Sequence, residues 1–125
     1  MIFDTDVLIW IQRGNRKAAR QVDRETERRL SVLSYMELMQ GARDKRQQQT
    51  VKAFIKELGF QVLPVAENIG HRAAIYVEEY ALSHGLRASD AIVAATATEH
   101  DLTLCSGNAR HFKPIKQLRF RHFRP

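Results

Sequence analysis

Short apolar runs alternate with segments of helical periodicity along this chain, and that alternation restricts the choice of fold more than any other feature. The apolar runs, which we interpret as strands, are residues 1–3, 30–34, 60–63, 102–105 and 118–123. Apolar residues at helical spacing lie between them, for example Val51, Ile55 and Leu58. Strands that alternate with helices are typical of a parallel sheet. The sequence therefore predicts an α/β fold with a central, mainly parallel sheet of four to five strands, in a single domain of residues 1–125.

Carboxylates occur where the predicted strands lead into helices. Asp4 and Asp6 follow the first apolar run, Glu37 comes just after the second, and Asp90 begins a helix of small residues. In a parallel sheet these junctions share one edge, which is where α/β proteins bind ligands. We therefore expect Asp4, Glu37 and Asp90 to lie close together.

Each of these acids also has a purely structural interpretation. Asp is a common N-cap, so Asp4 and Asp90 fit the start of a helix, and Ser89 is a second candidate cap beside Asp90. Ser34 and Glu37 have the spacing of a capping box, in which the Glu carboxylate bonds to the backbone of the cap residue. The local sequence leaves both interpretations open, and only the recurrence of the pattern favours a site.

Three convergent carboxylates imply a cation, because like charges brought together cost stability unless something neutralises them. Oxygen ligands suit Mg²⁺ or Mn²⁺, and the chain has no cluster of Cys and His that would favour another metal. Such a site can activate water and stabilise a phosphodiester under attack. Asp4, Glu37 and Asp90 are therefore the predicted catalytic and metal-binding residues.

The net charge of +6 is concentrated at the C-terminal end. All 14 acidic residues precede Asn108, whereas six basic residues follow it: Arg110, Lys113, Lys116, Arg119, Arg121 and Arg124. A patch of this kind favours phosphate-bearing partners, although an ordinary solvated edge has the same composition. We expect Arg110 and this tail to contact the phosphates of such a partner. The segment 16–29 is also rich in Arg, but its Glu residues suggest an exposed helix or arm that serves solubility.

Cysteine content and hydropathy bear on location. The single cysteine, Cys105, excludes an internal disulfide and suits a reducing compartment. The apolar runs are too short to span a bilayer. We expect a cytoplasmic protein that does not act in a membrane.

Four segments, in order, resemble the signatures of PIN-domain ribonucleases, specifically the VapC toxins of toxin–antitoxin pairs. They are D-T-D-V-L-I at 4–9, S-Y-M-E-L-M-Q-G-A at 34–42, S-D-A-I-V-A-A-T-A at 89–97 and S-G-N-A-R-H-F at 106–112. Their order and spacing agree with the family, and the resemblance covers most of the chain. It implies a three-layer α/β/α sandwich, Mg²⁺-dependent endoribonuclease activity with Mn²⁺ as a possible substitute, homodimerisation and neutralisation by a cognate VapB-like antitoxin.

The resemblance also assigns roles to individual residues. Asp4, Glu37 and Asp90 match the acidic metal-binding triad, and Asp6 matches the supporting position beside the first acid. Asn108 stands where many PIN domains have a fourth acid, which leaves the number of metal ions open, and the Ser106 hydroxyl is expected to orient the site. Structured RNA such as tRNA or rRNA is the expected substrate.

Two other functions remain open from sequence alone. Asp4 and Asp6 after an apolar run also resemble the first motif of haloacid-dehalogenase-like phosphatases, in which the first Asp is the nucleophile. Those enzymes need a later Lys and a further acidic pair on a larger scaffold, and Asp90 has no acidic neighbour. The second alternative is a non-catalytic basic RNA-binding module whose acids are only helix caps.

Overall fold

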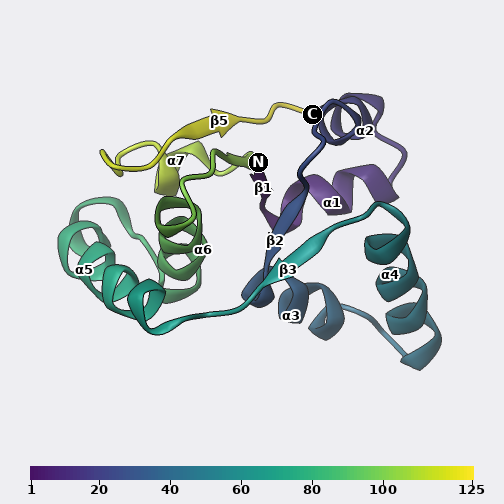
Figure 1. The fold of residues 1–125 in the computed structure, drawn as a ribbon, viewed down its shortest axis with the longest axis horizontal. Coiled ribbons are helices and arrows are strands. Elements are labelled where there is room, and N and C mark those ends of the chain that lie inside the picture. The colour runs from purple at the N-terminus through teal and green to yellow at the C-terminus, as the bar shows by residue number, and fades with distance from the viewer.

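The computed structural model describes residues 1–125 as five strands and seven helices (Figure 1). The strands are β1 (Ile2–Phe3), β2 (Arg29–Ser31), β3 (Gln61–Leu63), β4 (Leu104–Ser106) and β5 (Phe120–His122). The helices are α1 (Thr5–Gln12), α2 (Arg16–Asp23), α3 (Val32–Gln40), α4 (Lys45–Glu57), α5 (Glu67–His84), α6 (Ala88–Glu99) and α7 (Ala109–Phe112). None of these helices combines the length and the apolar character needed to cross a membrane.

The strands form one sheet in the order β3-β2-β1-β4-β5, and every neighbouring pair is parallel. The register pairs Phe3 with Cys105 and Ser106 with His122. The predicted α/β class and its parallel sheet are therefore confirmed.

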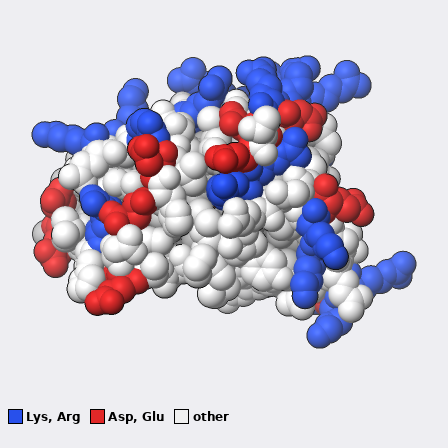
Figure 2. Space-filling model, in the orientation of Figure 1, with Lys and Arg blue, Asp and Glu red and all other residues white.

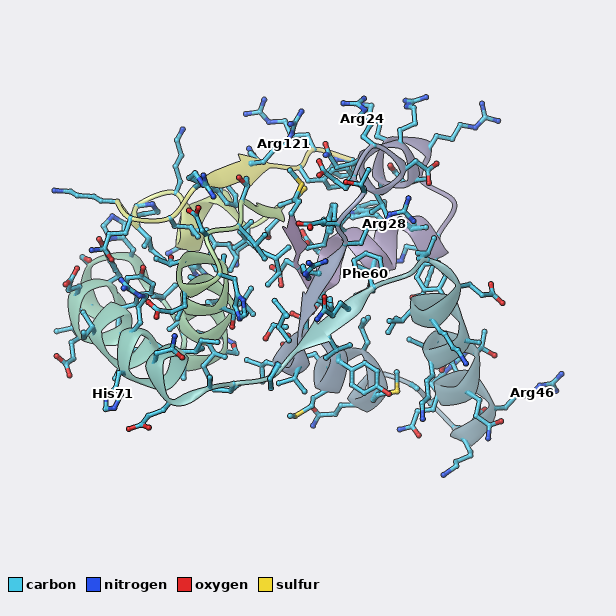
Figure 3. All side chains as sticks on the ribbon, in the orientation of Figure 1. Arg24, Arg28, Arg46, Phe60, His71 and Arg121 are labelled. Carbon is cyan, nitrogen blue, oxygen red and sulfur yellow. The ribbon has the colours of Figure 1, made fainter.

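Helices cover both faces of the sheet because successive strand residues point to opposite sides. Ile2 and Leu104 pack in a cluster with residues of α5, α6 and α7, whereas Phe3 and Cys105 pack with residues of α1, α2, α3 and α4. Figure 1 shows α5 and α6 on one side of the strands and α1, α2 and α4 on the other. On that second side Phe60, labelled in Figure 3, packs edge-on against Phe3 with ring centroids 5.7 Å apart. The three-layer α/β/α sandwich is confirmed.

Three strands end where the predicted site residues begin. Asp4 follows β1 directly, β2 runs into α3, and β4 ends at Ser106. Because these three strands are parallel neighbours, their carboxyl ends meet at one edge. The strand order thus brings these three chain segments to one edge of the sheet.

The second predicted strand was too long, and the reason is a helix cap. β2 stops at Ser31, whose Oγ accepts a hydrogen bond from the Leu33 backbone N–H at 3.2 Å, and α3 begins at Val32. Ser34 is consequently buried inside α3, and its Oγ has no hydrogen-bond partner. The capping box between Ser34 and Glu37 therefore does not form.

Candidate active site

Asp4 joins three elements at the carboxyl edge of the sheet. It is the N-cap of α1, and its Oδ1 accepts from the Thr5 backbone N–H at 2.9 Å. Its Oδ2 accepts from the Ser106 hydroxyl at 2.8 Å, and its backbone N–H donates to the Cys105 carbonyl at 3.0 Å. Asp4 is therefore a helix cap, as the structural interpretation required, and it is also hydrogen-bonded to the residue that ends β4.

A cavity of about 270 Å³ opens at this edge. Its lining includes five of the predicted site residues: Asp4, Asp6, Glu37, Asp90 and Asn108. They come from the start of α1, the middle of α3, the start of α6 and the loop after β4. The expectation that these junction residues lie close together is met, and four of the lining residues are acidic.

Two predicted residues do not line the cavity. Ser106 is fully buried behind it and reaches it only through the hydrogen bond to Asp4. Arg110 is exposed on α7, two residues beyond Asn108, and is not part of the lining. The structure thus places Ser106 as a support for Asp4, whereas Arg110 lies outside the cavity.

Each of the other acids has its own hydrogen-bond partner. Glu37 Oε1 accepts from the Thr5 hydroxyl at 3.2 Å, and Asp90 Oδ2 lies 2.9 Å from His111 Nδ1. Asp6 Oδ2 accepts from the Gly107 backbone N–H at 2.7 Å. With these partners in place, no three His, Cys, Asp or Glu side chains are arranged as a ready-made metal site.

The clustering of acids perturbs their ionisation. Burial raises the pKa of Asp4 to about 7, and the negative charges of Asp6 and Asp90 add to this rise. Hydrogen bonds from Ser106 and Thr5 oppose it. Burial also raises the pKa of Asp6, against the effect of the Gly107 N–H. A positive charge in the cavity would relieve both carboxyl groups, because a nearby opposite charge favours the ionised form.

The residues present fit a hard divalent cation. Every polar side chain that lines the cavity carries a carboxylate, hydroxyl or amide oxygen, and these are the donors that Mg²⁺ and Mn²⁺ prefer. One of these oxygens, Asp6 Oδ1, is buried and has no hydrogen-bond partner within the chain. Buried carboxylate oxygens without a partner are costly, so Asp6 Oδ1 adds to the cost of the clustered acids. Asp4, Glu37 and Asp90 are the residues that could hold the ion.

The loop after β4 is shaped around Asp6. A Cβ at position 107 would lie 2.6 Å from Asp6 Oδ2 and 3.4 Å from the Phe123 carbonyl oxygen, so Gly107 is needed for the close approach. In the sequence, Gly107 stands out only as a member of the segment 106–112 that resembles the family. Its physical role, bringing a backbone N–H to a carboxylate, is visible only in the folded chain.

Sequence reasoning missed two polar residues that contact the acids. Thr5 contacts both Asp4 and Glu37, and His111 contacts Asp90 and, through the same Nδ1, the Asn108 amide at 3.0 Å. For His111 a signal was available, since it follows Asn108 by three residues, the spacing of one helical turn. For Thr5 none was, because threonine beside an N-cap is unremarkable.

Asp90 is the third residue of α6 rather than its N-cap, and its carboxylate accepts from the backbone N–H of the N-cap, Arg87, as in a capping box. Its Oδ2 lies 3.4 Å from the Arg87 backbone N, a long hydrogen bond, and 2.9 Å from His111 Nδ1. Ser89, the other candidate cap, lies within α6 and lines the cavity. The carboxylate of Asp90 is thus closer to His111 of α7 than to the backbone N–H at its own helix start.

Comparison with known proteins agrees with this arrangement. The model of the PIN domain matches residues 1–117. The chain belongs to the PIN-domain family. A curated relative of this PIN domain is Ribonuclease VapC10 of Mycobacterium tuberculosis, 32% identical over an alignment of 124 positions that covers 95% of this chain and 90% of the relative. The chain is thereby placed with the VapC members of the family, as its four segments predicted.

Solved structures give the same fold. A toxin–antitoxin complex from Klebsiella pneumoniae contains a chain that matches with a TM-score of 0.79 and 28% identity, over 94% of this PIN domain and 93% of that chain. VapBC2 from Rickettsia felis, bound to a fragment of its promoter DNA, matches with a TM-score of 0.83 and 18% identity, over 99% of this chain and 100% of that one. The second likeness concerns the fold alone.

Proposed function

We propose that this PIN domain is a metal-dependent endoribonuclease that acts as the toxin of a toxin–antitoxin pair. The observation that carries the proposal is the cavity with four carboxylates, among which the pKa of Asp4 is raised to about 7. An arrangement that costs stability without a cation is expected at a functional site rather than in a scaffold. The relative named a ribonuclease and the solved toxin–antitoxin complex support the choice of reaction.

In this proposal Asp4, Glu37 and Asp90 hold Mg²⁺, or Mn²⁺ in its place. The ion supplies a positive charge that activates water and stabilises the phosphodiester as its charge develops. Ser106 keeps the Asp4 carboxylate in orientation through its hydroxyl.

Neighbouring groups complete the site. Gly107 holds Asp6 beside the triad, and Asn108 supplies an uncharged amide where other members of the family carry an acid. His111 Nδ1 lies within hydrogen-bond distance of both Asp90 and Asn108. With a proton it donates to Asp90, and without one it accepts from the Asn108 amide, so it holds one of these lining side chains at a time.

We also propose the partners that the family implies. A cognate VapB-like antitoxin encoded nearby would bind and inhibit the protein, and structured RNA such as tRNA or rRNA would be the substrate. The buried free thiol of Cys105 suits a reducing compartment, which favours the cytoplasm. Co-expression of the neighbouring small open reading frame should suppress both toxicity and RNA cleavage, and unchanged toxicity would contradict the partner. Homodimerisation stays a prediction, for light scattering to test.

The phosphatase alternative lacks a residue that it needs. No Lys lines the cavity beside Asp4, so nothing there would serve as the cationic partner of a phosphorylated aspartate. The RNA-binding module alternative differs in its outcome, since it predicts RNA binding that is indifferent to chelator and no cleavage.

The test is RNA cleavage by the purified protein with and without metal. Cleavage should require Mg²⁺ or Mn²⁺ and stop in excess EDTA. Glu37→Gln and Asp90→Asn should each lower it by about two orders of magnitude or more, because a neutral amide is a poor ligand for Mg²⁺. Glu78→Gln, which neutralises an exposed acid of α5, is the matched control and should cleave like the wild type. Undiminished cleavage in EDTA would overturn the proposal.

A further inference from the structure

A second cavity of about 270 Å³ lies between α2 and β5 and shares no lining residue with the acidic one. Lys17, Arg20 and Arg24 of α2 and its C-cap line one wall, and Arg121 and Arg124 line the other. No acidic residue is part of the lining. We call this hollow the basic groove.

The local structure explains why these charges gather. In α2 the residues Ala18 and Val22 are buried against the sheet, so Lys17, Arg20 and Arg24, spaced by three and four residues, share the outer face. Figure 2 shows Lys and Arg crowded along the upper edge of the molecule, over the region where Figure 1 places α2 and the C-terminus. Figure 3 shows Arg24 and Arg121 at that same edge.

The cations of the basic groove have no partners within the chain. None of the five forms a salt bridge or a side-chain hydrogen bond. Elsewhere Arg72 pairs with Glu99 and Arg119 with Asp101. Like charges held around one hollow repel one another, so an anion bound there would be stabilised by all of them.

The lining indicates which kind of anion. Phe123 is its only apolar residue and is itself 6% exposed, so a partner helix would find no apolar surface on which to anchor. Four of the five cations are arginines, whose planar guanidinium groups donate in pairs to phosphate oxygens. A regular polyanion such as a phosphodiester backbone fits this surface better than an amphipathic polypeptide.

The basic groove is joined to the acidic cavity by one strand pair. The Phe123 backbone N–H donates to the Ser106 carbonyl at 2.9 Å, and the Ser106 hydroxyl donates to Asp4 at 2.8 Å. The groove therefore begins at the residues that pair with the end of β4, next to the site. We propose that the basic groove binds the phosphodiester backbone of the RNA substrate next to the segment that enters the acidic cavity. This inference rests on the proposed function, whose site it extends.

The test compares two charge-matched double variants. Arg20→Ala/Arg24→Ala removes two exposed cations from the basic groove, and Lys45→Ala/Arg46→Ala removes two exposed cations from α4. Binding of a fluorescein-labelled single-stranded RNA is followed by anisotropy in EDTA, which prevents metal-dependent cleavage, across a salt titration. Each lost phosphate contact lowers the slope of log K against log salt by about 0.7.

The groove variant should therefore lose about 1.4 from that slope. When the salt concentration is raised from about 50 to about 200 mM, both affinities fall. The factor by which the affinity falls should be about sevenfold smaller for the groove variant than for the wild type. The α4 variant should keep the wild-type slope. Equal slopes for the groove variant and the wild type would overturn the proposal, and so would an equal loss in the α4 variant, since the effect would then be one of net charge.

Cleavage gives an independent readout. With Mg²⁺ the groove variant should show a raised KM on long RNA with kcat unchanged, because the acidic cavity is intact. If the wild type and the groove variant bind RNA with the expected difference in slope but the wild type never cleaves it, the proposed function is refuted and the basic groove stands. A wild-type protein that cleaves, with a groove variant that binds and cleaves identically, would refute the groove alone.

Discussion

The substitution Asp4→Asn separates a catalytic carboxylate from an ordinary helix cap through its effect on pH-dependent stability. The pKa of Asp4 in the fold is raised from 3.8 to about 7, so without metal the folded protein binds a proton that the unfolded chain releases. A carboxyl group whose pKa is raised by folding stabilises the folded protein fully at pH values below its pKa in the unfolded chain. This stabilisation is lost as the pH rises through its pKa in the folded protein. The metal-free wild type should therefore lose stability between about pH 4 and pH 7.

The size of the effect follows from the shift. About three pKa units correspond to roughly 4 kcal/mol at most, at 1.36 kcal/mol for each unit. The Asn amide still accepts from the Thr5 N–H and the Ser106 hydroxyl, and the strengthening of these bonds by the charge is already included in the shift. In EDTA at pH 8, Asp4→Asn should be more stable than the wild type by about 2 to 4 kcal/mol. At pH 4 to 5 this advantage should vanish.

The assay is urea unfolding in EDTA at several pH values, followed by far-ultraviolet circular dichroism. Asp44→Asn is the matched control, because Asp44 also caps a helix, accepting from the Gln47 N–H at 2.8 Å, but is exposed and does not line the cavity. Asn caps nearly as well as Asp, so this variant should keep the wild-type pH profile within a few tenths of a kcal/mol. Added Mn²⁺ should stabilise the wild type and not Asp4→Asn. The argument from buried like charges is wrong if the free energy of unfolding of Asp4→Asn falls with rising pH as steeply as that of the wild type. It is also wrong if the variant is less stable than the wild type at pH 8.

Two further substitutions test the support of the site. Gly107→Ala places a Cβ 2.6 Å from Asp6 Oδ2 and should lower the free energy of unfolding by about 1–3 kcal/mol. Gly70→Ala, which meets nothing within 4 Å near the start of α5, should instead raise it by up to about 1 kcal/mol. Thermal melts decide this, and equal melting of Gly107→Ala and the wild type would refute the packing argument. Ser106→Ala removes a hydrogen bond that lowers the pKa of Asp4, so the loss of stability with rising pH should move to higher pH in the same urea series. An unmoved transition would show that the hydroxyl does not tune Asp4.

The positions of the main acids could be predicted from sequence because they depend on chain order and strand direction. Asp4 directly follows β1, Glu37 lies in the helix that follows β2, and Asp90 lies in the first turn of α6. Parallel strands bring such junctions to one edge of a sheet. The extent of the second strand could not be predicted, since an apolar run reads equally as a strand or a buried helix. Ser31 decided it by capping α3.

Contacts between residues far apart in sequence were decided by the tertiary structure alone. From the sequence alone, the arginines of α2 suggest a solubilising surface, and the basic character belongs to the C-terminal tail. The fold instead places Arg20 and Arg24 of the α2 region beside Arg121 and Arg124, about a hundred residues later, and turns Arg119 of the same tail to Asp101. Periodicity shows which face of a helix is exposed, because that depends on near neighbours. The surface that faces these arginines depends on how the apolar side of α2 packs against the sheet that contains β5. That packing is driven by apolar residues, and it determines which charged side chains come together.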